Sequence, residues 1–217
     1  KFQILTHIRH SEKVLVMRVF LSVLLLIFSL QSWTMADDIR DFEIEGMSIG
    51  DSLLNYLSKS EIQNSFNGTK NHYTWLKEPL KFREAYLYGR NSKFQTYKNV
   101  SFMVNPKDPK YKILFIRGMK DFINDINTCL KTRSEISKNI EMIFPKFKKR
   151  NEDFKSSLDK SGKSYYKQIV YTFVSGDEIL ISCNDWNEKI RLKNNWTEGL
   201  SVAIQKKEIA DWWLEKK

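Results

Sequence analysis

The chain has 217 residues and a formal net charge of +10, with 36 basic and 26 acidic side chains. This length suits one domain with a substantial hydrophobic core. Acidic residues interleave with the basic ones and no nucleic-acid-binding motif accompanies them, so the sequence argues against a nucleic-acid partner.

The N-terminal region predicts a targeting segment that is not part of the fold. Met17 and Arg18 precede an apolar run from Val19 to Leu30, and Thr34-Met35-Ala36 follows. A basic start, an apolar centre and a small-residue exit are the parts of a signal peptide. We therefore expect an upstream translated segment at 1–16, a signal peptide at 17–36 that is cleaved after Ala36, and a periplasmic location. An uncut membrane anchor is the alternative.

The first half of the mature chain predicts short helices followed by strands. Apolar residues at helical spacing predict one helix around Ile49, Leu53, Leu54 and Leu57 and a second over 61–66. Each of these helices begins with capping-box spacing, which Ser58 and Glu61 show in the second. Alternating apolar residues predict strands at 84–88, 97–104 and 111–117.

The second half predicts one long helix and three more strands. An apolar stripe marks a helix over 121–144, and Pro145 ends it. The charged segment 146–163 is expected to be a mobile loop or partly helical. The remaining predicted elements are strands at 167–174, 178–183 and 200–204 and a closing helix over 207–215.

These elements predict an α+β fold. Strands in adjacent hairpins with helices between them imply an antiparallel sheet, or sheets, of about six strands, covered by one long and two or three short helices. We expect a single domain over 37–217. A division into two subunits near 46–118 and 119–217 is the alternative.

Two cysteines predict a disulfide. Cys129 lies on the apolar stripe of the long helix, and Cys183 shares a strand face with Ile179 and Ile181. An even number of cysteines in an exported chain favours a bond between them. Two buried free thiols are the alternative.

The best match to a catalytic motif is Gly50-Asp51-Ser52-Leu53, which resembles the nucleophile block of the GDSL-type hydrolases. A nucleophilic serine needs a base. That family places its histidine near the C-terminus, whereas the single histidine of the mature chain is His72. We therefore expect no catalysis and keep a serine hydrolase using Ser52 as an alternative. The spacing of His and Cys predicts no metal site and no cofactor.

Two sets of residues are candidates for contact with a partner. Lys146, Lys148, Lys149 and Arg150 form a basic stretch that predicts weak, salt-sensitive binding to an anionic surface. Trp196, Trp212 and Trp213, with Trp186, are candidate interface aromatics, and completing the core is the alternative role for them.

Three stretches carry a family resemblance. ADDIRDFEIEGMSIGDSLL at Ala36–Leu54 resembles the start of an uncharacterised family of small exported proteins from marine alphaproteobacteria. YKILFIRGM at Tyr111–Met119 and ISCNDW at Ile181–Trp186 are similar to that family's other recurrent blocks. The resemblance implies export to a periplasm and assigns no functional residue. The order of two short helices and three strands is similar, at the level of fold alone, to BamE-like envelope lipoproteins, although no lipobox cysteine follows the predicted signal peptide.

The sequence therefore favours a non-catalytic, exported binding or adaptor module of the bacterial cell envelope. The expected partner is an unknown envelope protein or an anionic surface, and we expect neither nucleic acid nor metal. A basic protein associated with the membrane surface is a further alternative, beside the Ser52 hydrolase.

Overall fold

The computed structural model describes residues 39–69, 80–88 and 94–215. The upstream segment 1–16 and the predicted signal peptide 17–36 lie outside the described residues, as does His72. Within the described part, no helix combines the length and the apolar character needed to cross a membrane.

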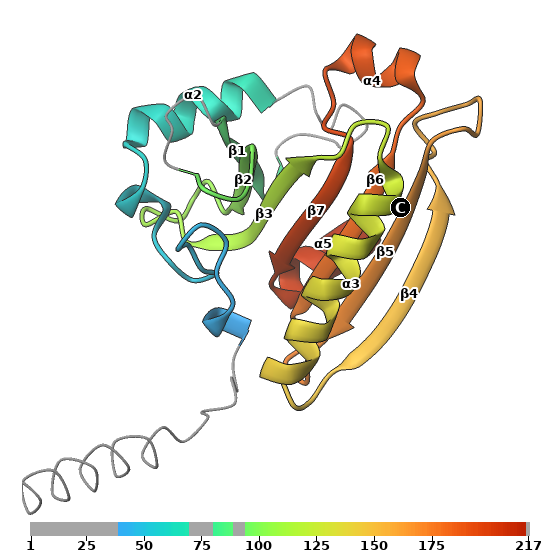
Figure 1. The fold of residues 1–217 in the computed structure, drawn as a ribbon. Coiled ribbons are helices and arrows are strands. Elements are labelled where there is room, and N and C mark those ends of the chain that lie inside the picture. The colour runs from blue at the N-terminus through green and yellow to red at the C-terminus, as the bar shows by residue number, and fades with distance from the viewer. Residues whose placement is uncertain (1–38, 70–79, 89–93, 216–217) are drawn as a thin grey trace, which may run out of the picture. The chain divides into compact units, whose positions relative to one another are not determined.

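One antiparallel sheet of seven strands organises the described residues (Figure 1). The strand order is β1-β2-β3-β7-β6-β5-β4. The strands are β1 (Arg83–Tyr88), β2 (Asn99–Val104), β3 (Ile113–Asp121), β4 (Lys148–Lys155), β5 (Tyr165–Thr172), β6 (Glu178–Asp185) and β7 (Gly199–Gln205). The helices are α2 (Lys59–Thr69), α3 (Ile126–Ile143), α4 (Glu188–Asn194) and α5 (Lys207–Glu215), with 3-10 turns at Ile39–Asp41 and Leu53–Asn55. The α+β prediction is confirmed, and the sheet has one strand more than the six expected.

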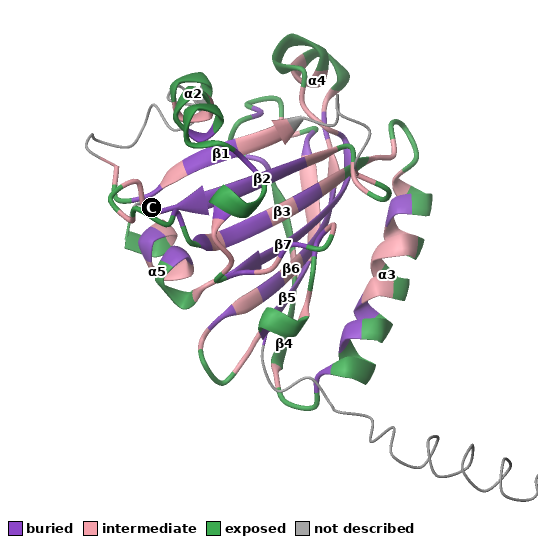
Figure 2. Ribbon diagram, turned by 90° about the vertical axis from the view of Figure 1, so that its left-hand side faces the viewer, coloured by how far each residue is buried: buried purple, intermediate pink, exposed green. Residues whose placement is uncertain are grey.

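The two faces of the sheet differ in what covers them. The first face, which carries Ile181, Cys183 and Val202, belongs to a large apolar core that also includes residues of α2, α3 and the N-terminal segment. On the second face, α5 covers a smaller apolar cluster around Phe115 and Trp212. Figure 2 shows α3 and α5 on opposite sides of the sheet. The second face is therefore only partly closed by helix.

The helix predicted around Leu53 is wrong for most of its length. The backbone N–H groups of Gly50 and Leu53 donate to the carbonyl oxygens of Ile113 and Tyr111, at 2.8 and 3.1 Å. This segment therefore lies along the start of β3, and only the 3-10 turn at Leu53–Asn55 forms. Ile49, Leu53 and Leu57 are buried all the same, whereas Leu54 is exposed, so the apolar spacing predicted most of the burial but not the conformation.

Helix starts follow side-chain caps. At α2, Ser58 N donates to the Glu61 carboxylate (2.7 Å) and Glu61 N donates to Ser58 Oγ (3.3 Å), as the capping-box spacing predicted. The long helix begins later than predicted, because β3 continues to Asp121, which pairs with Gly199 of β7. Asp125 caps α3 instead, and its carboxylate accepts the N–H of the residue three positions later at 3.1 Å.

The charged segment 146–163 is a strand followed by an ordered turn, which corrects the predicted mobile or partly helical segment. Every residue of β4 pairs with β5, from Lys148 opposite Thr172 to Lys155 opposite Tyr165. Most side chains of β4 are exposed. Because β4 is the last strand of the sheet and contacts water on both faces, it does not need the apolar alternation by which strands are recognised.

Asp159 orders the turn between β4 and β5. Its carboxylate accepts hydrogen bonds from Ser161 N (2.8 Å), Ser164 N (2.9 Å) and Ser164 Oγ (2.7 Å). The hydrogen bonds from Ser161, joined by those from Ser164, hold the pKa of the Asp159 carboxyl well below its usual range, although burial opposes them. The charged form of Asp159 is therefore the form that holds the turn.

We expect this turn to open in acid. A carboxyl group with a lowered pKa stabilises the folded state fully above its unfolded value, 3.8, and loses that contribution as the pH falls below it. The amide NMR signals of Ser161 and Ser164 should keep their folded positions down to a pH well below 3.8 and shift only as the Asp159 carboxyl becomes protonated. In Asp159→Asn these signals should not follow that titration, and an unchanged titration in the variant would contradict the assignment.

Candidate binding surface

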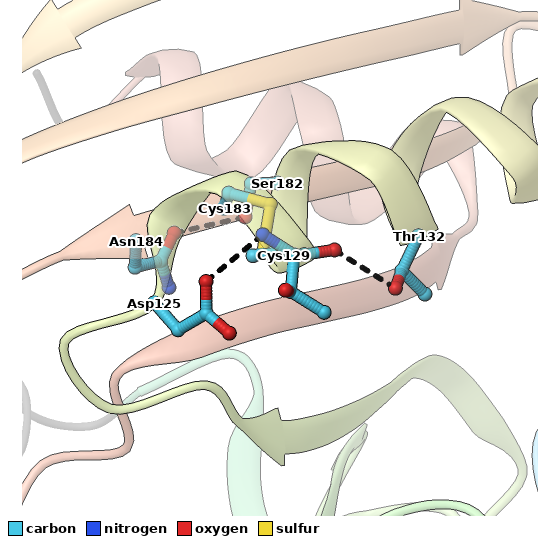
Figure 3. Close-up of a disulfide and its surroundings, with 7 residues drawn as sticks. Asp125, Cys129, Thr132, Ser182, Cys183 and Asn184 are labelled. Carbon is cyan, nitrogen blue, oxygen red and sulfur yellow. Dashed lines mark hydrogen bonds between the residues drawn. A yellow bond between two sulfur atoms is a disulfide. The ribbon is translucent and has the colours of Figure 1, made fainter.

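The predicted disulfide is present and buried. Cys129 of α3 and Cys183 of β6 are bonded, with their Cα atoms 6.0 Å apart, and neither side chain is exposed (Figure 3). The bond fixes α3 against the first face of the sheet and closes a loop across 54 residues. Such a bond is compatible with an exported protein in an oxidising compartment.

Ser52 is not placed as an activated nucleophile by the described residues. Its Oγ donates a hydrogen bond to the carbonyl oxygen of Lys110 at 2.6 Å, and its backbone bridges to Lys112. A backbone carbonyl cannot take the proton that a serine loses on attack, so this contact does not activate the hydroxyl. The three histidines of the chain lie outside the described residues.

A second serine lies among groups of the type used in catalysis. Ser137 Oγ is 2.5 Å from Tyr171 Oη and 3.3 Å from Lys149 Nζ. The carboxylate of Glu141 accepts from Lys149 (2.6 Å) and from Tyr171 (2.8 Å). The hydrogen bond to Glu141 raises the pKa of Lys149, although burial opposes it. Lys149 therefore stays cationic and cannot act as a base towards Ser137, so the cluster ties α3 to β4 and β5.

The four basic residues predicted to contact an anionic surface do not form one patch. Alternation along β4 sends neighbouring side chains to opposite faces of the sheet. Lys149 pairs with Glu141 of α3 at 2.6 Å, whereas Arg150 pairs on the second face with Glu152 (3.2 Å) and Glu178 (3.4 Å). Lys146 and Lys148 are exposed, and neither forms an ion pair with another described residue.

The predicted interface tryptophans lie in two separate places. Trp212 lies on the buried side of α5, where its ring meets Phe82 edge-to-face at 5.4 Å, and Trp213 contacts it at 4.7 Å between centroids. Trp196 lies beyond the opposite end of β7 and contacts Trp186 at 4.5 Å. Trp212 therefore belongs to the core, and Trp196 belongs to a different group of aromatic side chains.

Polar side chains line the part of the second face that α5 does not cover. The pairing register places Met119, Ser201, Ser182, Gln168 and Glu152 in one row across five strands and Asn184, Tyr166 and Phe154 in the next row. We call these two rows the open face. None of the eight belongs to the apolar cluster beneath α5. On the first face, the row through Leu200 and Cys183 is apolar and buried at its centre, whereas Lys167 and Asp153 continue it towards the edge of the sheet as charged side chains.

An aromatic row runs along the open face towards α4. Phe154 stacks on Tyr166 (4.9 Å between centroids), Tyr166 meets Trp186 edge-to-face (5.3 Å), and Trp186 contacts Trp196. The indole N–H of Trp186 donates to the carbonyl oxygen of Thr197 at 3.1 Å, which fixes the ring. Phe154 ends the row and is 44 % exposed. The row thus presents apolar ring surface beside the polar side chains.

Charged groups on this side of the sheet are paired with each other. The Arg117 guanidinium donates from Nη2 to the buried Glu84 carboxylate (3.2 Å) and to Tyr86 Oη (3.1 Å). Arg150 pairs with Glu152 at the other end, as described above. Burial raises the pKa of Tyr166 to about 12, so its hydroxyl stays neutral. The open face therefore carries little net charge in a chain of +10.

A polar pocket lies where α3 begins. It has a volume of about 250 Å³ and is lined by Phe122, Asn124, Ile126, Asn184, Asp185 and Glu198. The chain's own groups use both carboxylates. Glu198 accepts from Asn124 N (2.6 Å) and pairs with Arg191 (3.4 Å). Asp185 accepts a hydrogen bond from the Tyr165 hydroxyl, which raises the pKa of Tyr165 to about 12. Among the described residues, no cluster of three or more His, Cys, Asp or Glu could hold a metal ion.

Comparison with known proteins gives no relative for this chain: no family model, no curated protein and no solved structure matches it. The candidate site therefore depends on the structure alone. Sequence reasoning found Trp186 and Trp196 but missed Phe154 and Tyr166. The sequence carries no pattern that joins them, because Phe154 and Tyr166 become neighbours only through the pairing of β4 with β5.

Removing the disulfide should lower stability strongly. In the chain-entropy model, a bond that closes a loop of this length contributes about 4 kcal/mol to the free energy of unfolding. We expect the double variant Cys129→Ser/Cys183→Ser to lose an amount of this order in urea denaturation. Ser182→Ala, next to the bond, is the control and should change stability far less. Equal midpoints for the double variant and the wild type would contradict the role assigned to the bond.

Removing the Tyr171 hydroxyl should cost about 1 kcal/mol of unfolding free energy, because a hydrogen bond between buried groups is lost. Tyr171→Phe keeps the ring, which is fully buried. Tyr56→Phe is the matched control, since its hydroxyl binds Asp51 at an exposed position (2.8 Å). If both variants lose the same stability in thermal denaturation, the cluster does not hold α3 in the way described.

Proposed function

We propose that the protein is an exported, non-catalytic binding module of the cell envelope, and that its open face binds a neutral glycan chain. The aromatic row beside a row of short polar side chains carries the proposal. Rings such as that of Phe154 offer apolar surface on which a sugar ring can lie. The amides of Gln168 and Asn184 are partly exposed and are suited to hydrogen-bonding sugar hydroxyls, whereas the hydroxyls of Ser182 and Ser201 are buried beneath the surface.

Charge supports an uncharged ligand. Partners are selected by complementary charge, and on this side of the sheet neither sign is in excess. Arg117 is engaged by Glu84, and Arg150 by Glu152. An acidic ligand would instead be drawn to exposed lysines such as Lys146 and Lys148, which form no ion pair with another described residue. Because the charged groups on the open face are already paired with each other, an uncharged ligand is favoured there over a charged one.

Export is the second part of the proposal. The predicted signal peptide Met17–Ala36 and the buried disulfide support it, because such bonds persist in oxidising compartments. An envelope location would bring the open face into contact with extracellular or cell-wall glycans.

Tryptophan fluorescence can test this proposal directly, because Trp186 and Trp196 are part of the aromatic row. Titration with uncharged oligosaccharides of increasing length should change the emission, with tighter binding for longer chains. Phe154→Ala should weaken the binding at least tenfold, because it removes the exposed ring at the end of the row. Leu214→Ala, at an exposed position on α5, is the matched control and should bind as the wild type does.

Three results would overturn the glycan proposal. The first is an unchanged emission with every uncharged oligosaccharide. The second is binding of a polyanion that collapses with added salt, which would favour a basic surface as the site. The third is binding of an extended uncharged peptide, but of no oligosaccharide, to the wild type and not to Phe154→Ala, which would assign the open face to a protein partner.

A further inference from the structure

The outer edge of β4 is available for pairing. β4 is the last strand of the sheet, and it pairs on one side only, with β5. Among the residues that the structure describes, no strand and no backbone hydrogen bond occupies its other side. Figure 1 shows β4 at the margin of the sheet, with no labelled helix beyond it. An edge strand of this kind presents backbone N–H and C=O groups that another chain can pair with.

The order of charges along β4 is self-complementary. The strand reads KKRNEDFK, with basic residues before Asn151 and acidic residues after it. When two copies pair antiparallel with Asn151 opposite Asn151, Arg150 lies opposite Glu152 and Lys149 lies opposite Asp153. The two-fold axis repeats each pair, so four pairs of opposite charge face each other across one interface. Opposite charges in directly facing positions stabilise paired strands.

In the same register, side chains that face each other across the interface point to the same side of the combined sheet. A two-fold axis perpendicular to the sheet relates antiparallel neighbours, so each side chain must face one that points to the same side. Arg150 and Glu152 both point to the second face, and Lys149 and Asp153 both point to the first. The sheet can therefore continue from one copy into the other, with both α3 helices on one side and both open faces on the other.

Neighbouring registers that also match the faces are unfavourable. Moving the axis to Glu152 places Glu152 opposite itself and Lys149 opposite Lys155. Moving it to Arg150 places Arg150 opposite itself and leaves two pairs of opposite charge, Lys148 with Glu152, instead of four, so this register is less favourable. Like charges that face each other directly destabilise strand pairing, so the charge order selects the register centred on Asn151.

The charged groups on β4 are accessible for such pairing. The side chain of Asp153 is 64 % exposed and its intrachain partner, Lys167, is 3.8 Å away. The side chain of Arg150 is 49 % exposed and that of Lys149 is 36 % exposed. Charges of a single sign on an edge strand commonly prevent pairing, because two copies of that strand repel each other. Here both signs are present in an order that makes the antiparallel pair attractive.

We propose that β4 is a self-pairing edge through which two copies of this chain form a two-fold dimer with a continuous sheet. The interface is centred on Asn151 and depends on the cross-strand pairs of Arg150 with Glu152 and of Lys149 with Asp153. β4 also carries Phe154 and Glu152 of the open face, so the two proposals share this strand, and they are separated by their tests: sedimentation reports association of the chain, and tryptophan fluorescence reports glycan binding.

Sedimentation velocity over a range of protein concentrations tests the dimer. The wild type should dimerise at low ionic strength, and added salt should weaken the dimer, because exposed charge pairs are screened. Asp153→Lys places Lys149 opposite a lysine, and Lys149→Asp places an aspartate opposite Asp153. Each variant alone should raise the dimer dissociation constant at least tenfold, and an equimolar mixture of the two should restore dimerisation as a heterodimer.

A second pair of variants keeps the test independent of the contacts that Lys149 makes inside the chain. Arg150→Glu and Glu152→Arg should each be monomeric and should associate when mixed. Lys193→Asp, the same kind of charge reversal at an exposed position on α4, should leave the wild-type dimer intact. Circular dichroism confirms that each variant is folded. A wild type that is monomeric throughout, or folded variants whose mixtures do not associate, would overturn the proposal.

Discussion

Backbone pairing between β3 and β7 joins the two parts of the sheet, and the rest of the architecture depends on it. The two strands run side by side from Phe115 opposite Gln205 to Asp121 opposite Gly199. At the last pair the chains approach so closely that a Cβ on Gly199 would lie 2.4 Å from the backbone nitrogen of Phe122, and the positive φ of this residue (+129°) also favours glycine. Because β3 and β7 pair along this length, the two halves form one sheet, and one row of the open face can extend from β3 to β4.

A continuous antiparallel sheet allows its two faces to serve different purposes. The first face supplies most of the buried apolar surface, and the bond between Cys129 and Cys183 fixes α3 on it. Since stability comes largely from that side, the second face is free to carry polar side chains and partly exposed rings. Among the described helices, α5 covers the end of this face near Phe115 and Trp212. The candidate binding surface is therefore a consequence of the unequal covering of one sheet.

Periodic apolar patterns predicted most of the elements, and the failures have physical reasons. The closing helix occupies the predicted residues, because its apolar stripe and its packing agree. β4 carries few apolar side chains and could not be recognised by alternation. α4 was missed because its start depends on a single capping contact from Asn187 and its residues show no buried stripe. The segment around Leu53 has helical spacing, yet its backbone pairs with β3, which is a long-range contact that local pattern cannot reveal. For the same reason Phe154 and Tyr166 could not be joined to Trp186 before the register was known.

The disulfide also determines how the chain responds to mechanical force. A pull on both ends of the fold travels along the backbone to Cys129, crosses the sulfur atoms and continues from Cys183, so the residues enclosed by this separation of 54 positions bear no load. These residues would extend by about 190 Å as a free chain, and that contour length stays hidden while the bond is intact. Most of α3 with β4 and β5 lies inside the shielded loop, whereas β1, β2, β3 and β7 lie outside it. Stretching can therefore separate β7 from β3 without lengthening β4 and β5 at the opposite edge of the sheet. A cut in the turn after β4 lies between the two cysteines, so the disulfide keeps both pieces covalently joined.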